Sequence, residues 1–225
     1  HEALAAMIMK GNGPHLSHAT VFHELIPGHG LQMFMAARYN SHRSVFETPF
    51  YGEGWCLGWE FDMYDMGFHA APEDRIGALF WRMHRAARII FTLNYQMGLW
   101  SPQRCVDFLV SNGHERYTAE GEVRGHVQNS PPTYQISYML GALQLRAMRR
   151  ELIAEKKAFT TKRFNDAFLR TGPMPMEIVT VASSESTKPS KMRYENVSIP
   201  IKLLGGVYTN DPSSRNVSKP RLVVL

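Results

Sequence analysis

Apolar residues recur at spacings of three and four along most of the first 180 residues. This spacing places apolar side chains on one face of an α-helix. The segments that share it are Ala19–Tyr39, Glu53–Met66, Glu73–Gly98, Gln103–Ser111, Ala119–Gln128, Pro132–Glu155 and Lys162–Leu169. The pattern therefore predicts an all-α domain.

Local signals support several of the helix ends. A capping hydroxyl precedes three of the helical segments, twice with Pro in the first turn, and Gly follows the end of others. The expected starts are at Ser101, Ser130 and Thr161, and the expected stops are at Gly67, Gly113 and Gly172.

The pattern changes after about residue 183, where Ser, Thr, Pro and Gly replace the helical spacing. We expect residues 1–183 to form the helical domain and residues 184–225 to form a loop-rich tail, with short strands at Asn196–Leu204 and Leu222–Leu225. Residues 186–225 hold seven basic and two acidic residues, so these residues carry the whole net charge of +5. A nucleic-acid-binding domain has a basic stripe on its folded body. The neutral body therefore argues against a nucleic-acid partner.

Composition narrows the class of protein further. The chain has 225 residues, 44% hydrophobic and 20% charged, which is typical of a globular protein. Its apolar runs are far shorter than the roughly 20 residues that a membrane-spanning helix needs.

The two cysteines, Cys56 and Cys105, are compatible with pairing or with free thiols, and they leave the cellular compartment of the protein open. Because His1 begins within a segment that reads as a helix (Glu2–Lys10), we expect the chain to be a fragment or a processed form.

One segment carries a chemical signature: His23-Glu24-Leu25-Ile26-Pro27-Gly28-His29. Zinc peptidases place two histidines on one helix as ligands, with a Glu beside the first that contacts the metal-bound water. Their usual spacing is four residues, whereas here it is six, which on a straight helix leaves the second ring about 120° off the first face. Pro27-Gly28 breaks and redirects a helix, so a kinked helix is expected at this place. The plain alternative is an ordinary helix end.

Glu53 is a candidate third ligand from the next helix, 24 residues beyond His29. The alternative is an acid favoured in the first turn by the helix dipole. Glu60 lies seven residues further on a similar face. It is either a partner that orients a metal-bound His or a surface acid.

Together these residues resemble a bacterial domain-of-unknown-function family, numbered 885, of the zincin-like metallopeptidase superfamily. The likeness rests on His23–His29, Leu31-Gln32 and Glu53-Gly54-Trp55, and it continues to Pro173–Glu177, covering roughly residues 10–180. The chain departs from the family's pattern at Gly30, Gln96, Gly125 and Asn165. The spacing from His29 to Glu53 is also similar to that in angiotensin-converting-enzyme-like and thimet-like peptidases, which are all-helical.

The resemblance implies one zinc ion per chain, held by His23, His29 and Glu53, with Glu24 as general base. It implies a peptide or small amide substrate, and it identifies the chain as a C-terminal catalytic half whose other cleft wall lies upstream. The likeness to converting-enzyme-like peptidases favours Tyr138 as the oxyanion donor and suggests His126 as a substrate-binding residue. Tyr134 and Gln135 are candidates for substrate contact. The alternative for both tyrosines is a core aromatic with a hydrated hydroxyl.

Other conspicuous residues receive plainer interpretations. A stripe of methionines and aromatics is expected in the core: Met33, Phe34, Met35, Phe61, Met63, Phe80, Trp81 and Met83. A solvated face is the favoured interpretation of Arg82, Arg85 and Arg88, with binding of a peptide carboxylate as the alternative.

The sequence supports a zinc-dependent peptidase and leaves three rivals. The first is a zinc-binding relative with weak or no catalysis, and the second is a metal-free helical binding module. The third is a zinc hydrolase of non-peptide amides. Oligomeric state and localisation are not determined by the sequence.

Overall fold

The structure is a computed structural model. It describes residues 12–129, 131–155, 157 and 159–179, together with residues 2, 5, 6 and 9. The described residues belong to one compact unit, His1–Tyr194. The strands expected between residues 184 and 225 lie outside the described residues.

Helices account for all the regular structure of the described residues, as the spacing predicts. None of these helices is both long enough and apolar enough to span a lipid bilayer. In chain order they are α2 (Pro14–Glu24), α3 (His29–Tyr39), the 3-10 helix η1 (Ser41–Phe46), α4 (Pro49–Asp65), α5 (Pro72–Gln96), α6 (Pro102–Ser111), α7 (Arg116–Asn129), α8 (Tyr134–Arg149), the π-helical turn η2 (Arg150–Glu155) and α9 (Thr161–Thr171).

Most of the expected boundary signals act as predicted. The Ser101 hydroxyl accepts a hydrogen bond from Arg104 N at the start of α6. The three stop glycines all have positive φ, a conformation that other residues rarely adopt: Gly67, Gly113 and Gly172. Two helix starts differ from the prediction. The N-cap of α9 is Thr160 rather than Thr161, and α8 begins at Tyr134 rather than Pro132.

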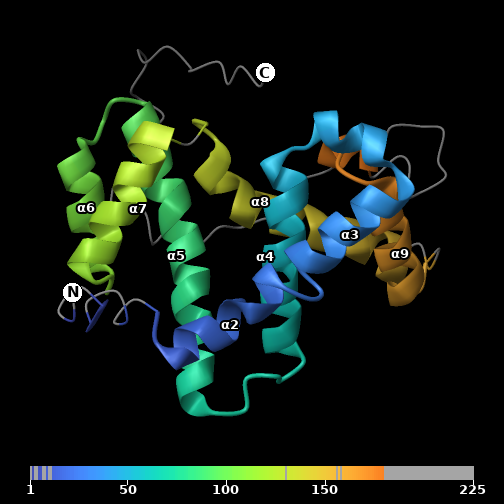
Figure 1. The fold of residues 1–225 in the computed structure, drawn as a ribbon, viewed down its shortest axis with the longest axis horizontal. Helices are drawn as coiled ribbons and strands as arrows, with labels where there is room; N and C mark the ends of the chain where they lie inside the picture. Colours follow the sequence, from blue (N-terminus) through green and yellow to red (C-terminus); the bar gives the residue numbers. More distant parts are fainter. Residues whose placement is uncertain are drawn as a thin grey trace, which may run out of the picture. The chain divides into compact units, whose positions relative to one another are not determined.

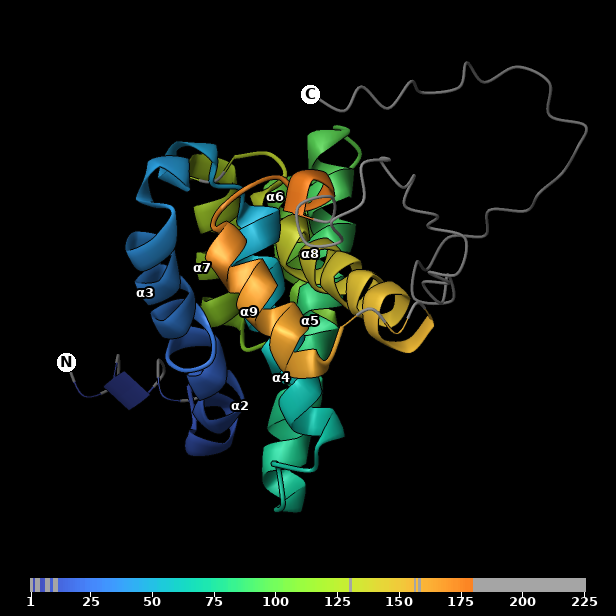
Figure 2. The same ribbon diagram turned by 90° about the vertical axis from the view of Figure 1, so that its right-hand side faces the viewer.

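Helix α4 is the central element, and ten of its residues are buried. It packs against α8 and α2, and α5 lies against α2 and α8 in turn. Figure 1 shows α6 and α7 beyond α5, and α3 and α9 beyond α4. Figure 2, the view turned by 90°, shows α9 beside α3, which agrees with their direct contacts. Segments distant in the sequence thus meet around α4.

Two glycines allow α4 and α8 to approach closely. A Cβ on Gly54 would lie 2.5 Å from the backbone carbon of Gly141, and a Cβ on Gly141 would lie 2.3 Å from Phe50 O. Any larger residue would push the helices apart. This close crossing brings the side chains of α8 next to those of α4.

The core consists of separate apolar clusters. The largest joins α4, α8 and α9 around Trp55, Leu145 and Phe168, and another joins α5, α6 and α7 around Phe91 and Leu109. The expectation of one buried Met and aromatic stripe is wrong at Met33 and Phe34, which are 63% and 59% exposed on α3. Met33 and Phe34 thus lie on the solvent-exposed side of α3, whereas Leu31 and Met35 pack against the cluster around Trp55.

Candidate metal centre

The motif that carries the chemistry spans a break between two helices. Helix α2 ends at Glu24 and α3 begins at His29, so the expected single kinked helix is two helices. Gly28 N donates to Phe22 O, and Gly30 N donates to Leu25 O, both at 2.8 Å. A Cβ on Gly28 would lie 1.9 Å from His23 O, so this tight turn requires glycine there.

The turn brings the two histidines of the motif together. Their ring centroids are 5.0 Å apart, although His23 lies in the last turn of α2 and His29 begins α3. His23 is buried, whereas the His29 side chain is 21% exposed. The turn therefore brings the two imidazole rings together, which a spacing of six residues on a straight helix would not do.

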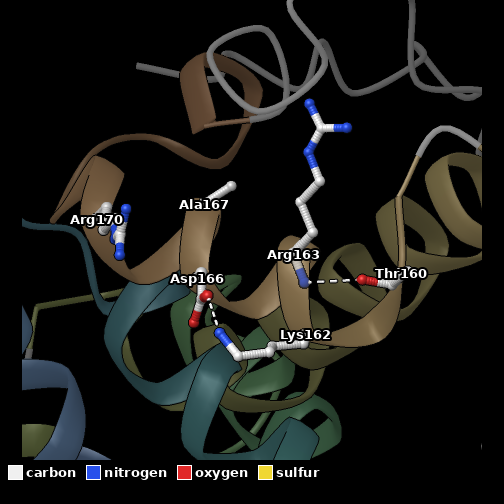
Figure 3. Close-up of a pocket in the computed structure, with 6 residues that line it drawn as sticks. All are labelled: Thr160, Lys162, Arg163, Asp166, Ala167 and Arg170. Atoms are coloured by element: carbon white, nitrogen blue, oxygen red, sulfur yellow. Dashed lines mark hydrogen bonds and ion pairs between the residues drawn. The ribbon is translucent and has the colours of Figure 1, made fainter.

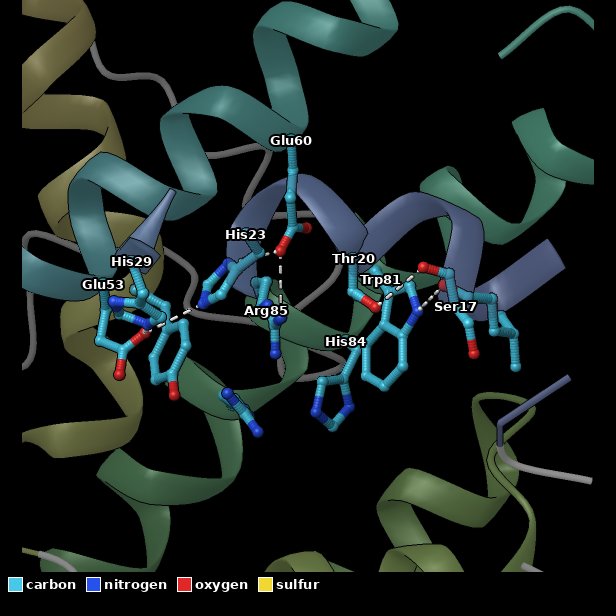
Figure 4. A network of polar contacts seen from close by, with 12 residues as sticks. Ser17, Thr20, His23, His29, Glu53, Glu60, Trp81, His84 and Arg85 are labelled. Carbon is cyan, nitrogen blue, oxygen red and sulfur yellow. Dashed lines mark hydrogen bonds and ion pairs between the residues drawn. The ribbon is translucent and has the colours of Figure 1, made fainter. Parts of the chain in front are cut away.

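Glu53, on α4, lies opposite both histidines. Its Oε2 is 3.2 Å from His23 Nε2 and 3.4 Å from His29 Nε2, and Figure 4 shows the three side chains pointing toward one another. Two imidazole nitrogens and a carboxylate oxygen are the donor set that catalytic zinc sites use. The three residues that the sequence singles out as ligands thus converge, and their chemistry fits a zinc ion.

Glu60 contacts the far side of His23. Its Oε1 lies 2.8 Å from His23 Nδ1, within ion-pair distance but at an angle poor for a hydrogen bond, and it accepts from Arg85 Nη2 at 3.2 Å. Figure 4 shows Glu60 between His23 and Arg85. An acid in this position orients the imidazole so that Nε2 faces Glu53. Of the two interpretations of Glu60, the surface acid is wrong, because the residue is 7% exposed.

The charges of this cluster are strongly coupled. Burial acts to raise the pKa of Glu53, but hydrogen bonds from His23, His29 and Tyr134 outweigh it and the pKa lies far below its usual range. Burial acts to lower the pKa of His23, but its contacts with Glu53 and Glu60 reverse the sign and the pKa is raised. Glu60 is paired with Arg85, and Glu53 is held as a carboxylate that faces both histidines.

Two tyrosines of α8 reach the centre from the other side. Tyr134 Oη donates to Glu53 Oε1 at 2.7 Å, and the two tyrosine hydroxyls are 3.3 Å apart. A carboxylate only accepts, so the single hydroxyl proton of Tyr134 is used on Glu53. The proton between the tyrosines is therefore donated by Tyr138.

The ring of Tyr138 is held between the candidate ligands and two arginines of α5. It stacks on His23 with ring centroids 5.8 Å apart and planes at 15°. The guanidinium carbons of Arg85 and Arg88 lie 4.8 Å and 4.6 Å from its centroid. Burial and the charge of Glu53 raise the pKa of Tyr138, so its hydroxyl stays protonated and able to donate.

The other expected site residues are placed less centrally. Glu24 is the last residue of α2, directly after His23, and its side chain is exposed. Gln135 is buried on α8, and its Oε1 has no hydrogen-bond partner within the described part of the chain. His126 is buried, and its contacts run to Phe91, Tyr95 and Gln96 of α5.

The solvated arginine face expected on α5 is wrong for Arg85 and Arg88. Both are buried, and Arg88 forms two hydrogen bonds to the carboxylate of Glu122 at 2.7 Å and 3.0 Å. Helix α5 is covered by α2 and α8, so its charged residues find partners inside the fold. Arg85 and Arg88 of α5 therefore belong to an interior network rather than to a solvated face.

One residue near the centre was not singled out from the sequence as a ligand. Cys56 is fully buried on α4, and its sulfur and one nitrogen each of His23 and His29 lie within 4.8 Å of one another. Both cysteines are free. The available signal was the position of Cys56 one helical turn after Glu53, on a similar face.

A surface pocket lies apart from this chemistry, on α9 (Figure 3). Its lining is Thr160, Lys162, Arg163, Asp166, Ala167 and Arg170. Lys162 and Asp166 form an ion pair across one turn of the same helix. The pocket contains no metal-ligand set among these residues.

The fold and the centre together define an all-α domain in which two histidines and a glutamate from three helices meet. Residues 9–182 match the family described as bacterial proteins of unknown function, DUF885. The chain belongs to this family. No curated protein matches it.

A solved structure shares the fold. It is the crystal structure of a protein described as the putative lipoprotein from Colwellia psychrerythraea, with a TM-score of 0.71 and 23% sequence identity. The match covers 79% of this chain and 31% of that protein. The chain thus spans about a third of the length of that relative.

Proposed function

We propose that this chain is a zinc-dependent hydrolase of peptide bonds, with His23, His29 and Glu53 as the metal ligands. The observation that carries the proposal is that one oxygen of Glu53 lies within 3.4 Å of an imidazole nitrogen of each histidine. One zinc ion per chain is the expected cofactor. The resemblance to zincin-like metallopeptidases supports the same ligand set.

A bound zinc ion would lower the pKa of a water molecule toward neutrality and polarise the scissile carbonyl. The remaining steps belong to residues of the chain. Glu24 follows the first ligand and has an exposed carboxylate, so it can accept a proton from water and pass it to the leaving amine. Tyr138 supplies a protonated hydroxyl for the developing oxyanion.

Two groups keep this arrangement in place. Tyr134 fixes the orientation of the Glu53 carboxylate through its 2.7 Å hydrogen bond. Glu60, itself held by Arg85, keeps the His23 ring turned toward Glu53. Gln135 and His126 are the candidate substrate contacts.

The first experiment is the metal content of the purified chain by elemental mass spectrometry. We expect about one zinc per chain, retained in His42→Ala, which changes an exposed histidine of η1, and lost in the His23→Ala, Glu53→Ala double variant. Absence of zinc from the wild type after metal is added would leave the metal-free helical module.

The second experiment is cleavage of a peptide library, followed by mass spectrometry, with wild type and Glu24→Gln. We expect the variant to keep its zinc and lose on the order of 10²–10⁴-fold in rate, the usual contribution of a general base. Zinc binding without cleavage by the wild type would select the inactive relative. Amide cleavage without peptide cleavage would select the non-peptide hydrolase.

A further inference from the structure

Cys56 occupies the same face of α4 as the two acids of the metal centre. It follows Glu53 by three residues and precedes Glu60 by four, spacings that share a helix face. Both acids contact His23, so this face of α4 is turned toward the histidines. The sulfur lies within 4.8 Å of one ring nitrogen of His23 and of one of His29, a group that does not include Glu53.

The surroundings of Cys56 differ from those of the other buried cysteine. The Cys105 thiol contacts Phe91 O at 3.9 Å and belongs to the apolar cluster of α5, α6 and α7. Cys56 belongs to the apolar cluster of α4, α8 and α9, but unlike Cys105 it also lies close to two histidines. It is therefore placed where a sulfur atom can reach the metal, and Cys105 is not part of that group.

We propose that Cys56 is a further ligand of the metal ion that His23, His29 and Glu53 bind. The inference rests on the proposed function. On binding, the S–H bond breaks, a sulfur–metal bond forms, and the proton is released to solvent. No oxidant or reductant takes part.

Binding of Cys56 to the metal would change the coordination of the centre in its resting state. Zinc sites with three protein ligands keep a fourth position for water, whereas sites with four are closed and structural. With its sulfur bound, Cys56 takes the position that a hydrolytic water needs. The chain then has a closed resting state, from which hydrolysis requires the sulfur to take up a proton and leave the metal so that water can bind. The thiolate also favours soft and borderline metals over magnesium or calcium.

The test uses cobalt as the probe, because a thiolate ligand to Co²⁺ produces a near-ultraviolet charge-transfer band that nitrogen and oxygen ligands do not produce. The metal-free chain, kept reduced and under anaerobic conditions, is titrated with Co²⁺ in three forms: wild type, Cys105→Ala and Cys56→Ala. Since the chain has only two cysteines, a band in Cys105→Ala can come from Cys56 alone. Cys56→Ser replaces Cys56→Ala if the latter does not fold.

We expect one cobalt per chain in all three proteins, with the band present in wild type and Cys105→Ala and lost in Cys56→Ala. Cobalt bound at one per chain without the band in wild type would overturn the role of Cys56 and leave the metal site intact. Absence of cobalt binding to the wild type would overturn both proposals. A band lost in Cys105→Ala but kept in Cys56→Ala would also overturn the assignment.

Discussion

Trp55 Nε1 donates a hydrogen bond to Pro27 O at 2.7 Å. The bond joins α4, which carries Glu53, to the turn that separates His23 from His29. The indole ring is fully buried and stacks on Phe168 of α9. One side chain thus connects the helix of the third ligand, the turn between the first two, and the core.

This relationship predicts that Trp55→Phe weakens zinc binding. The aromatic ring is kept and the donor is lost, so the turn is held less firmly. We expect a loss in affinity on the order of tenfold, the lower end of what is seen when groups that orient ligands are removed. The control is Trp59→Phe, because the Trp59 indole nitrogen has no hydrogen-bond partner within the described part of the chain. Equal zinc affinities for the two variants would contradict this role of the indole.

The contact between Glu60 and His23 predicts the effect of Glu60→Gln. Loss of the charge frees the His23 ring and leaves Arg85 unbalanced, so zinc affinity should fall by about 10–100-fold. Competition with a chromophoric chelator measures it. Asp65→Asn is the matched control, since Asp65 lies on the same helix in an exposed pair with Arg146. A zinc affinity unchanged by Glu60→Gln would show that Glu60 pairs with Arg85 but does not orient His23.

The two tyrosines of α8 should separate into different kinetic roles. Tyr138→Phe removes the expected oxyanion donor, so kcat should fall about 10²–10³-fold while zinc stays bound. Tyr134→Phe removes a hydrogen bond to Glu53 and should weaken zinc binding first. Steady-state kinetics at saturating zinc, together with zinc titrations, distinguish the two. A Tyr138→Phe variant with the wild-type kcat would contradict the role of Tyr138 as oxyanion donor.

Two glycine substitutions should change the stability of the fold in opposite directions, because only one of the glycines lies at the close crossing of α4 and α8. Gly54→Ala places a methyl group 2.5 Å from the backbone of Gly141, and overpacking of this kind costs about 1–3 kcal/mol. Gly121→Ala on α7 meets nothing within 4 Å, so the better helix propensity should stabilise the fold by up to about 1 kcal/mol. Urea unfolding measures both. A neutral or stabilising Gly54→Ala would contradict the crossing.

A buried histidine pair predicts part of the pH dependence of stability. His84 Nδ1 lies 2.6 Å from His114 Nε2, with Arg85, Arg88 and Glu122 nearby. Burial and then the charges of the arginines hold the pKa of His84 well below its ordinary value of 6.5. The unfolded chain therefore binds more protons below pH 6.5, and stability is lost as the pH falls through that value.

The slope from one such group is limited to about 1.4 kcal/mol per pH unit. We expect His84→Gln to lose less unfolding free energy than wild type between pH 7.5 and 5.5. Comparing the two proteins at each pH cancels the contribution of His23, whose raised pKa acts in the opposite direction. Parallel pH curves for the two proteins would contradict a neutral, buried His84.

Much of the helical fold follows from local patterns. The stops at Gly67, Gly113 and Gly172 and the start at Ser101 depend on the conformations and capping groups that single residues allow. These preferences act within a few residues, so they are readable from the sequence. The break at Pro27-Gly28 is of the same kind, although its result is two helices rather than one kinked helix.

The composition of the centre depended on tertiary structure. Sequence spacing proposed His23, His29 and Glu53, but their convergence required the turn at Gly28 and the packing of α4 against α2 and α3. Cys56, the contact of Glu60 with His23 and the burial of Arg85 and Arg88 arise because α4 and α5 are covered on several faces. The sequence by itself determined the all-α class and several of the helix ends, because those signals are local. Only the packing decided which side chains meet, because that depends on which helix faces are covered by segments far away in the chain.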